Sequence, residues 1–132
     1  MPATSSDGSS RSDSANDGRL AAAISTGVVH VFAEHTGRGP TQARTTIDGT
    51  TVVVILQDGM TTAERSLVAG GKGSEVLQLR RSFQETMRDD LIAVVERLTA
   101  SSVHAFMSAN HIAPDIAAEI FLLDRKVGAA TS

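Results

Sequence analysis

The sequence predicts an α+β fold of two layers, in which helices pack on one face of a four-stranded antiparallel sheet. Residues 17–36 and 74–99 repeat apolar side chains at the three- and four-residue spacing of an amphipathic helix. Residues 43–57 contain a polar and an apolar strand-like stretch on either side of an Asp-Gly turn, and residues 102–123 contain two stretches of alternating apolar side chains, which is typical of strands joined as hairpins. With a short helix after the first hairpin, the expected order is α-β-β-α-α-β-β. The sequence does not determine the order of the strands in the sheet.

The composition is that of a single domain without cysteine chemistry. The chain has 132 residues, of which 41% are hydrophobic, and this is enough for one core. It contains no Cys, Trp or Tyr, so disulfides, thiolate metal sites and a cysteine nucleophile are excluded. The formal net charge of −3 argues against nucleic acid as the main partner.

Neither a membrane span nor a secretory signal is predicted. The longest apolar runs, such as residues 52–56, are far shorter than the ~20 residues that cross a bilayer. The first residues lack the basic and apolar regions of a signal peptide. We therefore expect a cytoplasmic protein with no transmembrane segment, and we expect no bound cofactor or metal.

Three regions are expected along the chain. Residues 1–16 carry almost no large apolar side chains, so they cannot repay the entropy of ordering and are expected to form a disordered tail. Residues 17–124 are expected to form the single folded domain, which starts with a helix capped by Asp17 and ended by Gly37. Residues 125–132 are expected to fray.

The first hairpin is expected to turn at Asp48-Gly49, the pair that a two-residue type I′ turn favours. This turn would place Thr45 opposite Val52 and fix which side chains share a face. The expected core face consists of Ala43, Thr45, Ile47, Val52, Val54 and Leu56.

The opposite face of this hairpin is mixed rather than polar. Arg44 and Thr46 lie on it, but so do Val53 and Ile55. We therefore expect a helix or a second subunit to cover these two apolar side chains.

The helices after the first hairpin have clear start signals. Thr61 and Glu64 form a capping box that opens a short helix, which a Gly-Gly pair then ends. Ser74 is expected to cap the longest helix, and its charged side chains, Arg80 among them, are expected to form a solvated face. The apolar stripe of this helix consists of Val76, Leu79, Phe83, Met87, Leu91, Val94, Val95 and Leu98.

The second hairpin is expected to pair residues 102–108 with residues 117–123. In the first of these strands, simple alternation places Val103 and Phe106 on opposite sides. In the second, it places Glu119 on the same side as Phe121 and Leu123. Residues 109–115 are expected to form the connecting loop, because they are too many for a tight turn and too polar for a strand.

The Gly-Arg-Gly-Pro turn after the first helix is the main candidate for ligand binding. Arg38 and the amides beside Gly39, together with Arg44 of the hairpin, could bind a carboxylate, bicarbonate or phosphate group. The alternative is that Gly37 and Pro40 only build a rigid corner between helix and strand.

Two further stretches contain side chains that could take part in chemistry. Asn110, His111 and Asp115 bring together an amide, an imidazole and a carboxylate, which suits an acid–base pair or a stabilised turn. No Ser, Cys or second His at a suitable spacing completes a triad or a zinc site. Gly-Gly-Lys-Gly-Ser at residues 70–74 lacks the Ser or Thr that follows the Lys of a phosphate-binding loop. We therefore expect a protein that is not an enzyme.

Several motifs, taken in order, carry a resemblance to a known family. They are Gly-Arg-Gly-Pro from residue 37, Asp-Gly-Thr-Thr-Val-Val-Val from residue 48, Met-Thr-Thr-Ala-Glu-Arg-Ser-Leu from residue 60, Arg-Arg-Ser-Phe-Gln-Glu-Thr-Met from residue 80, Glu-Arg-Leu-Thr from residue 96 and His-Ile-Ala-Pro-Asp-Ile-Ala-Ala-Glu-Ile-Phe-Leu-Leu from residue 111. Over about residues 18–124 the chain resembles the MpsC-like family. That family was long a domain of unknown function and was later named for a sodium-translocating, membrane-potential-generating system.

The resemblance implies structural positions but no established catalytic residue. The positions that match are Gly37, Gly39, Pro40, Thr61, Glu64, Arg81, Phe83, Leu98, Thr99, Glu119 and Phe121. Most of these residues are expected to have a structural role. The same role is expected for Asp48 and Gly49 of the predicted turn. Two positions depart from the pattern: Ala100 stands where a Gly is common, and Ala109 stands where an acidic residue is often found.

For function, the resemblance implies a small soluble companion of a bacterial membrane system for cation or inorganic-carbon uptake. We expect a non-enzymatic accessory protein that binds a membrane transport subunit or a small anion and forms a homo-oligomer, such as a homodimer, through Val53 and Ile55. Its location would be cytoplasmic and peripheral to the membrane through that partner. The alternatives are a sensor for an anion or nucleotide, whose site combines Arg38, Arg44 and His111, and an unrecognised enzyme.

Overall fold

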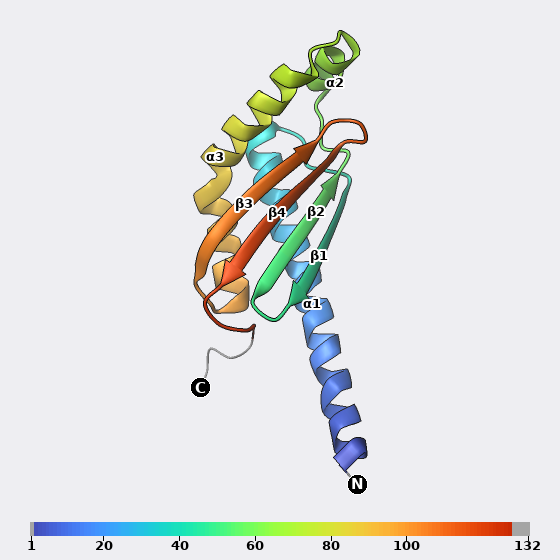
Figure 1. Ribbon diagram of the computed structural model, residues 1–132, viewed down its shortest axis with the longest axis vertical. Coiled ribbons are helices and arrows are strands. Elements are labelled where there is room, and N and C mark those ends of the chain that lie inside the picture. Colours follow the sequence, from blue (N-terminus) through green and yellow to red (C-terminus); the bar gives the residue numbers. More distant parts are fainter. Residues whose placement is uncertain (1, 128–132) are drawn as a thin grey trace.

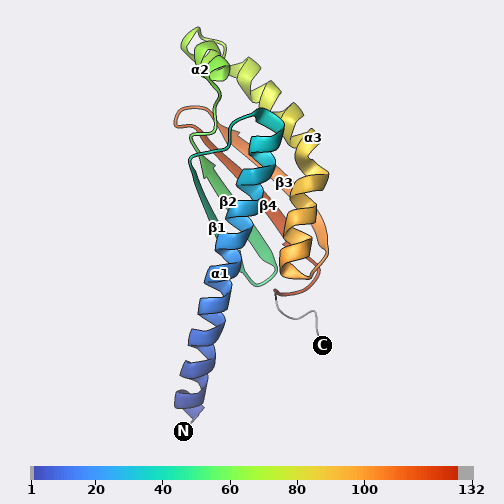
Figure 2. The same ribbon diagram turned by 180° about the vertical axis from the view of Figure 1, so that it is seen from behind.

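Two long helices, α1 (Pro2–Thr36) and α3 (Gly73–Thr99), lie on the same face of a four-stranded sheet. A short helix, α2 (Thr62–Ala69), lies beyond one end of the sheet (Figures 1 and 2). The structure is a computed structural model that describes the backbone of residues 2–127 and the side chains of residues 16–127. The predicted α+β class and the element order α-β-β-α-α-β-β are confirmed.

The sheet contains β1 (Gln42–Asp48), β2 (Thr51–Gln57), β3 (Val103–His111) and β4 (Ile116–Leu123). All neighbouring strands are antiparallel, and their order is β1-β2-β4-β3. Each hairpin therefore supplies one central strand and one edge strand. The pairing of β2 with β4 joins the two hairpins, and it is a contact between segments about 65 residues apart that no local sequence signal could specify.

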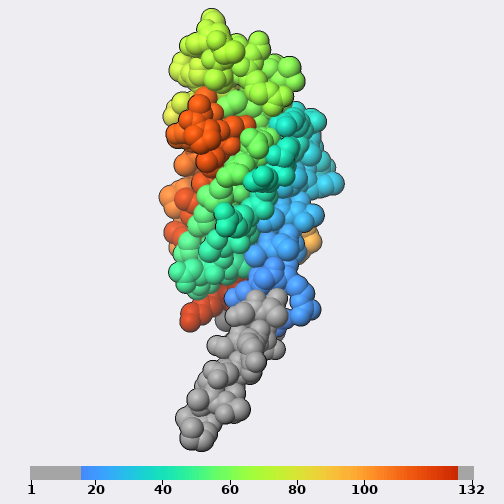
Figure 3. Space-filling view, turned by 90° about the vertical axis from the view of Figure 1, so that its right-hand side faces the viewer, coloured from blue at the N-terminus to red at the C-terminus, as the bar shows by residue number. Residues whose placement is uncertain are grey.

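The hydrophobic core lies between the two long helices and the inner face of the sheet. Its buried members are Ile24, Val28, Val31, Val52, Val54, Leu56, Met87, Leu91, Val95, Ala117, Phe121 and Leu123. The predicted core side of β2 is therefore correct. Helices α1 and α3 approach closely at Gly27, where a Cβ atom would lie 2.6 Å from Val94 Cγ1. Along one side of the molecule α1 lies beside the edge strand β1 (Figure 3).

The first hairpin turns one residue later than expected. Asp48 pairs with Thr51, so the two-residue loop is Gly49 and Thr50, not Asp48 and Gly49. Gly49 has a φ of 61°, and glycine at the first central position is the requirement of a type II′ turn. The register shifts by two residues, so that Thr45 opposes Val54. Because strand side chains repeat every two residues, the faces stay as predicted.

Two predicted helix starts are wrong and one helix end is confirmed. Helix α1 begins at Pro2 rather than after Asp17. Once a helix has formed, each further residue that joins it adds one backbone hydrogen bond, and only that residue has to be ordered. Helix α3 has Lys72 rather than Ser74 as its N-cap, and no side chain caps it. Helix α1 ends at Gly37 as predicted, where a φ of 79° closes the helix.

The second hairpin has a shorter connection than expected. Strand β3 continues to His111 and β4 starts at Ile116, so residues 112–115 make the whole connection. A bulge between Val103 and Ala105 shifts the alternation of β3. As a result Val103 and Phe106 both pack against the core, and the prediction that they lie on opposite sides is wrong.

The C-terminal region stays attached beyond the last strand. The Arg125 backbone N–H donates a hydrogen bond to Ser101 Oγ at 3.2 Å, and Val127 packs against the core. Residues 128–132, where fraying was expected, lie outside the described residues, as does Met1 of the expected tail. The division into a tail, one domain and a C-terminal end stays a prediction.

None of the helices in the described part of the chain combines the length and the apolar character that crossing a bilayer requires.

Candidate functional site

A small cavity lies between the C-terminal end of α1, the first half of α3 and the end of the sheet where β3 turns into β4. Its volume is about 40 Å³, which is room for about three water molecules or one very small ligand. The apolar part of its lining is Phe32, Pro40, Leu56, Gly59, Phe83, Met87 and Ala117, and the polar part is Thr36, Glu64, Arg80, Gln84, Asn110 and Asp115.

Arg80 is the one cation in this lining, and it is mostly buried, with 11% of its side chain exposed. Its Nη2 donates a hydrogen bond to Asp115 Oδ1, and its Nε lies 3.9 Å from Glu64 Oε2. Its Nη1 is buried and has no hydrogen-bond partner among the described residues. The expectation that Arg80 lies on a solvated face is wrong, because two carboxylates brought by other elements compensate its burial.

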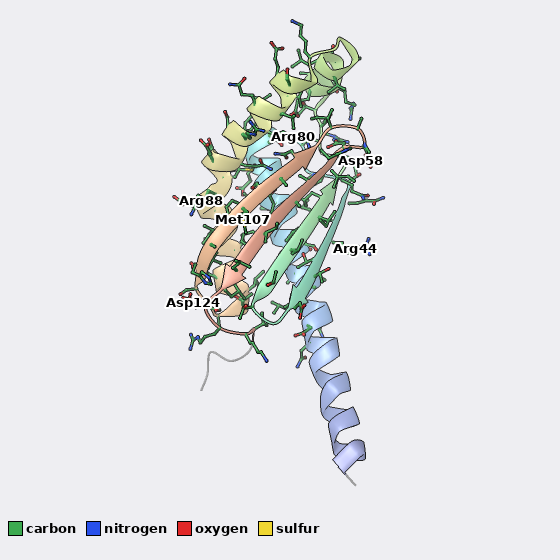
Figure 4. All side chains as sticks on the ribbon, in the orientation of Figure 1. Arg44, Asp58, Arg80, Arg88, Met107 and Asp124 are labelled. Atoms are coloured by element: carbon green, nitrogen blue, oxygen red, sulfur yellow. The ribbon has the colours of Figure 1, made fainter. Side chains whose placement is uncertain are left out.

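Each carboxylate beside Arg80 is itself held in place. The capping box at the start of α2 forms as predicted: Glu64 N donates to Thr61 Oγ1 at 3.1 Å, and Thr61 N donates to Glu64 Oε1 at 2.9 Å. Asp115, in the β3–β4 turn, accepts a hydrogen bond from the Met60 backbone N–H at 2.8 Å. These contacts tie α2, α3 and the β3–β4 turn together around one guanidinium group, which lies between α3 and the end of β3 (Figure 4).

A second polar cluster continues from the cavity toward the middle of the sheet. Gln84 and Asn110 exchange two amide hydrogen bonds, from Gln84 Nε2 to Asn110 Oδ1 at 3.0 Å and from Asn110 Nδ2 to Gln84 Oε1 at 2.9 Å. Gln84 Nε2 also donates to Glu119 Oε2 at 3.0 Å, and Ser108 Oγ donates to Glu119 Oε1 at 2.5 Å. Every oxygen of the buried Glu119 carboxyl group therefore has a partner.

Burial raises the pKa of Glu119 from its ordinary value of 4.5 to about 7. The hydrogen bonds from Ser108 and Gln84 and the positive charge of Arg80 oppose this change but do not outweigh it. Near neutral pH this carboxyl group is therefore close to half protonated, at a position that is 0% exposed to solvent.

The charges around the cavity limit what it can bind. Glu64 and Asp115 both face Arg80, so the three groups together are net negative. An anion would be repelled by these carboxylates, whereas Arg80 Nη1 can donate to a neutral oxygen. The cavity therefore suits a small neutral molecule with a carbonyl or hydroxyl oxygen. Among the residues that the structure describes, no group of three His, Cys, Asp or Glu is placed to hold a metal ion.

Arg38, Arg44 and His111, the ligand-binding residues suggested by the sequence, do not come together. Arg38 Nη1 donates to the backbone oxygens of Asp58 and Met60, both at 2.7 Å, and so holds the segment after β2. Arg44 is exposed on the edge strand β1 and points away from the sheet (Figure 4).

His111 lies at the end of β3, the opposite edge strand, and its Nδ1 donates to the Pro114 oxygen at 2.8 Å. Two central strands separate it from Arg44. Gly39 lies in the turn between α1 and β1, where a Cβ atom would be 3.0 Å from Val29 Cγ1. Its closeness to α1 gives this glycine a packing role.

The roles of Arg80 and Gln84 were not predicted from the sequence, although part of the signal is present in it. Gln84 is buried on α3 directly beside the apolar stripe, while Leu79, which was assigned to the stripe, is 39% exposed. Glu119 was placed correctly on the same side of β4 as Phe121 and Leu123. A carboxylate on a buried face predicts a polar partner, but the partner itself comes from a helix 35 residues away.

A second feature is the outer face of the sheet, defined as the side chains that point away from α1 and α3. Its apolar members are Val53, Ile55, Ala105, Met107, Ala109, Ile116, Ala118, Ile120 and Leu122. No element of the described chain covers this face, which is turned to the viewer in Figure 1. Met107 is the most open of the larger apolar side chains on it, with 48% exposed. Antiparallel sheets usually present polar side chains on an open face.

Comparison with known proteins gives one finding. No curated protein and no solved structure matches the chain. The family model described as Na+-translocating membrane potential-generating system (MpsC) matches residues 16–125, which is most of the chain. The resemblance seen in the sequence motifs is thereby confirmed, and the chain belongs to the MpsC family.

Proposed function

We propose that this protein is a non-enzymatic accessory component of a Na+-translocating membrane system, and that it acts by binding another protein chain through the outer face of its sheet. The family description supports the link to such a system. The uncovered apolar outer face is the observation that carries the mode of action.

The outer face has the composition of a binding surface. Its centre is apolar, and Gln42, Arg44 and Thr46 on the edge strand β1 give it a polar border on that side. An apolar centre with a polar rim is the usual anatomy of a protein interface. A contiguous apolar area of this kind on a monomer typically marks an interaction site.

Binding is favoured over chemistry by the state of the buried polar groups. Gln84 is paired with Asn110, Asp115 is paired with Arg80, and both oxygens of Glu119 accept hydrogen bonds. Groups paired in this way stabilise a fold, whereas a catalytic acid or base needs contact with its substrate. The proposal also implies a location: the protein lies in the cytoplasm and is held at the membrane by its partner.

Affinity capture from membranes tests the proposal. The tagged full chain is incubated with detergent-solubilised membranes that contain the Na+-translocating subunits, and the captured proteins are identified by mass spectrometry. We expect these subunits to be captured by the wild type and lost with Ile120→Lys, which places a charge in the centre of the outer face. Gln78→Lys, at an exposed position on α3, is the matched control.

Failure of the wild-type protein to capture any subunit of the system would count against the accessory role. Equal capture by Ile120→Lys and wild type would count against the outer face. Thermal unfolding of each variant must show a folded protein before its capture result is used.

The cavity beside Arg80 favours a second candidate function, a sensor of a small molecule. A ligand present at a hundred times its dissociation constant adds about 2.7 kcal/mol to the free energy of unfolding, which a thermal-shift measurement detects. We expect acetamide to raise the melting temperature more than bicarbonate, phosphate or a nucleotide does, because the cavity is small and its border is net negative. A larger effect of bicarbonate or of a nucleotide would instead support an anion sensor.

A further inference from the structure

We infer that, in the protein that is not bound to its membrane partner, a second copy of this protein packs on the outer face, sheet to sheet about a two-fold axis. This inference rests on the binding surface of the proposed function and names what occupies that surface in the free protein. The strand order, the charges of the face and its area support it.

The strand order makes the outer face complementary to itself. Strands β2 and β4 are central and β1 and β3 are the edges. A two-fold axis that lies between two stacked sheets, along or across the strands, brings the central strands of one copy onto the central strands of the other. Sheets packed in this way lie about 10 Å apart with their apolar side chains interlocked. Every such arrangement therefore brings the central apolar side chains of both copies together, those of Val53 and Ile55 on β2 and of Ala118 and Ile120 on β4.

The charges on the outer face also favour a second copy. On β2 and β4 the outer side chains are Thr51, Val53, Ile55, Gln57, Ile116, Ala118, Ile120 and Leu122, and none of them is charged. A strongly charged partner would lose solvation on this surface without finding a counter-charge. A second copy presents the same uncharged centre, and it keeps Arg44 and His111 at the rim, where water still reaches them.

The area of the sheet is sufficient for such a contact. The strands have 7, 7, 9 and 8 residues in the order β1, β2, β3, β4. With ~4.8 Å between strands and ~3.4 Å per residue, the face covers about 500 Å² in each copy. Two copies together then bury about 1,000 Å², which is close to the smallest area of a specific interface. We therefore expect a dimer that dissociates on dilution.

The first test is the mass of the purified full chain in solution. Light scattering and sedimentation over a hundredfold range of concentration are expected to show twice the chain mass at the upper end and a shift toward the monomer at the lower end. Ile120→Lys is expected to be monomeric throughout, and Gln78→Lys is expected to behave as the wild type. A monomeric wild type, or a dimer unaffected by Ile120→Lys, would overturn the inference.

Cross-linking gives a second test that does not depend on a disruptive substitution. The sequence contains no cysteine, so a single introduced cysteine supplies the only thiol of the protein. Ala118→Cys lies on β4 in the middle of the outer face, and Arg97→Cys lies exposed on α3. A bis-maleimide that spans about 10 Å, the distance between packed sheets, is expected to join two copies at position 118 and not at position 97. Equal cross-linking at both positions would contradict the proposed face.

The two proposals can fail separately. A purified protein that stays monomeric, while Ile120→Lys still abolishes capture of the membrane subunit, rejects the second copy and keeps the accessory role. A purified dimer that captures no membrane subunit rejects the accessory role and keeps the dimer.

Discussion

Gln84 on α3 donates a hydrogen bond to Glu119 on β4, with 3.0 Å between Gln84 Nε2 and Glu119 Oε2. This bond crosses the interface between the helix layer and the sheet, at a point where both side chains are buried. It makes the packing of α3 depend on a group whose charge changes near neutral pH.

Glu119 is expected to make the stability of the protein depend on pH. Its pKa is raised on folding, so the folded state prefers the protonated carboxyl group. Its contribution to stability is fully present below pH 4.5 and is lost as the pH rises through about 7. At about 1.4 kcal/mol for each pH unit between the two pKa values, the free energy of unfolding falls by about 3 kcal/mol over this range.

Glu119→Gln is expected to remove this dependence, since an amide does not titrate in that range. The measurement is urea unfolding at several pH values for wild type, Glu119→Gln and the exposed control Glu85→Gln. Glu85→Gln should follow the wild type. Parallel curves for wild type and Glu119→Gln would show that Glu119 does not titrate near pH 7.

Gly27→Ala is expected to destabilise the contact between α1 and α3. The new Cβ would lie 2.6 Å from Val94 Cγ1, so one of the helices or the Val94 side chain must move. Overpacking of this kind costs about 1–3 kcal/mol. Adding Val94→Ala should restore part of the loss. Gly18→Ala on the same helix meets nothing within 4 Å, so thermal unfolding should show it to be neutral or stabilising.

Ala100→Gly is expected to stabilise the protein. Ala100 closes α3 in the left-handed conformation, with a φ of 56° and a ψ of 32°, at the position where the family pattern commonly has a glycine. Glycine would relieve this strain, but it would also give the unfolded chain more conformational freedom, which lowers stability. The net effect should raise the free energy of unfolding by about 0.5–1 kcal/mol. Ala93→Gly, in the exposed middle of the same helix, should instead lower it by about 1 kcal/mol. A loss of stability in Ala100→Gly would be the contrary result.

Thr61→Ala is expected to lower the free energy of unfolding by about 1 kcal/mol, because it removes the side-chain acceptor of the Glu64 backbone N–H. Thr61→Ser keeps the hydroxyl group and should be close to wild type. Chemical unfolding measures both. Thr61→Ala should also loosen Glu64 beside Arg80. The loss in the free energy of unfolding should therefore be larger for Thr61→Ala than for Thr62→Ala, because the Thr62 side chain is exposed. Equal effects at positions 61 and 62 would speak against the capping box.

Local signals in the sequence were enough for most of the elements. The capping box at Thr61 and Glu64 forms because its two partners are three residues apart. The side-chain faces of β2 and β4 follow from alternation alone, and this placed Glu119 on the same side as Phe121 and Leu123; the structure shows that this side is buried. The turn at Gly49 was misplaced by one residue, because glycine suits more than one position of a two-residue loop.

The positions of Arg80 and of the predicted ligand residues depended on contacts that local patterns do not describe. A charged residue on a helix is normally solvated, and Arg80 differs only because α2 and the β3–β4 turn bring two carboxylates to it. Arg44 and His111 are far apart because β2 and β4 lie between their strands. The prediction for the faces of β3 was wrong because of the bulge after Val103. This bulge depends on the pairing of β3 with β4, which is also a contact between distant segments.

The sequence by itself determined the fold class, the order of the elements, the family and the apolar character of Val53 and Ile55, because propensity, periodicity and capping act over a few residues. Only the tertiary structure decided the strand order, the burial of Arg80, the bond from Gln84 to Glu119 and the continuity of the outer face across β2, β4 and β3. These features come from segments that meet only after the chain has folded, and their free energy depends on burial and pairing rather than on local conformation.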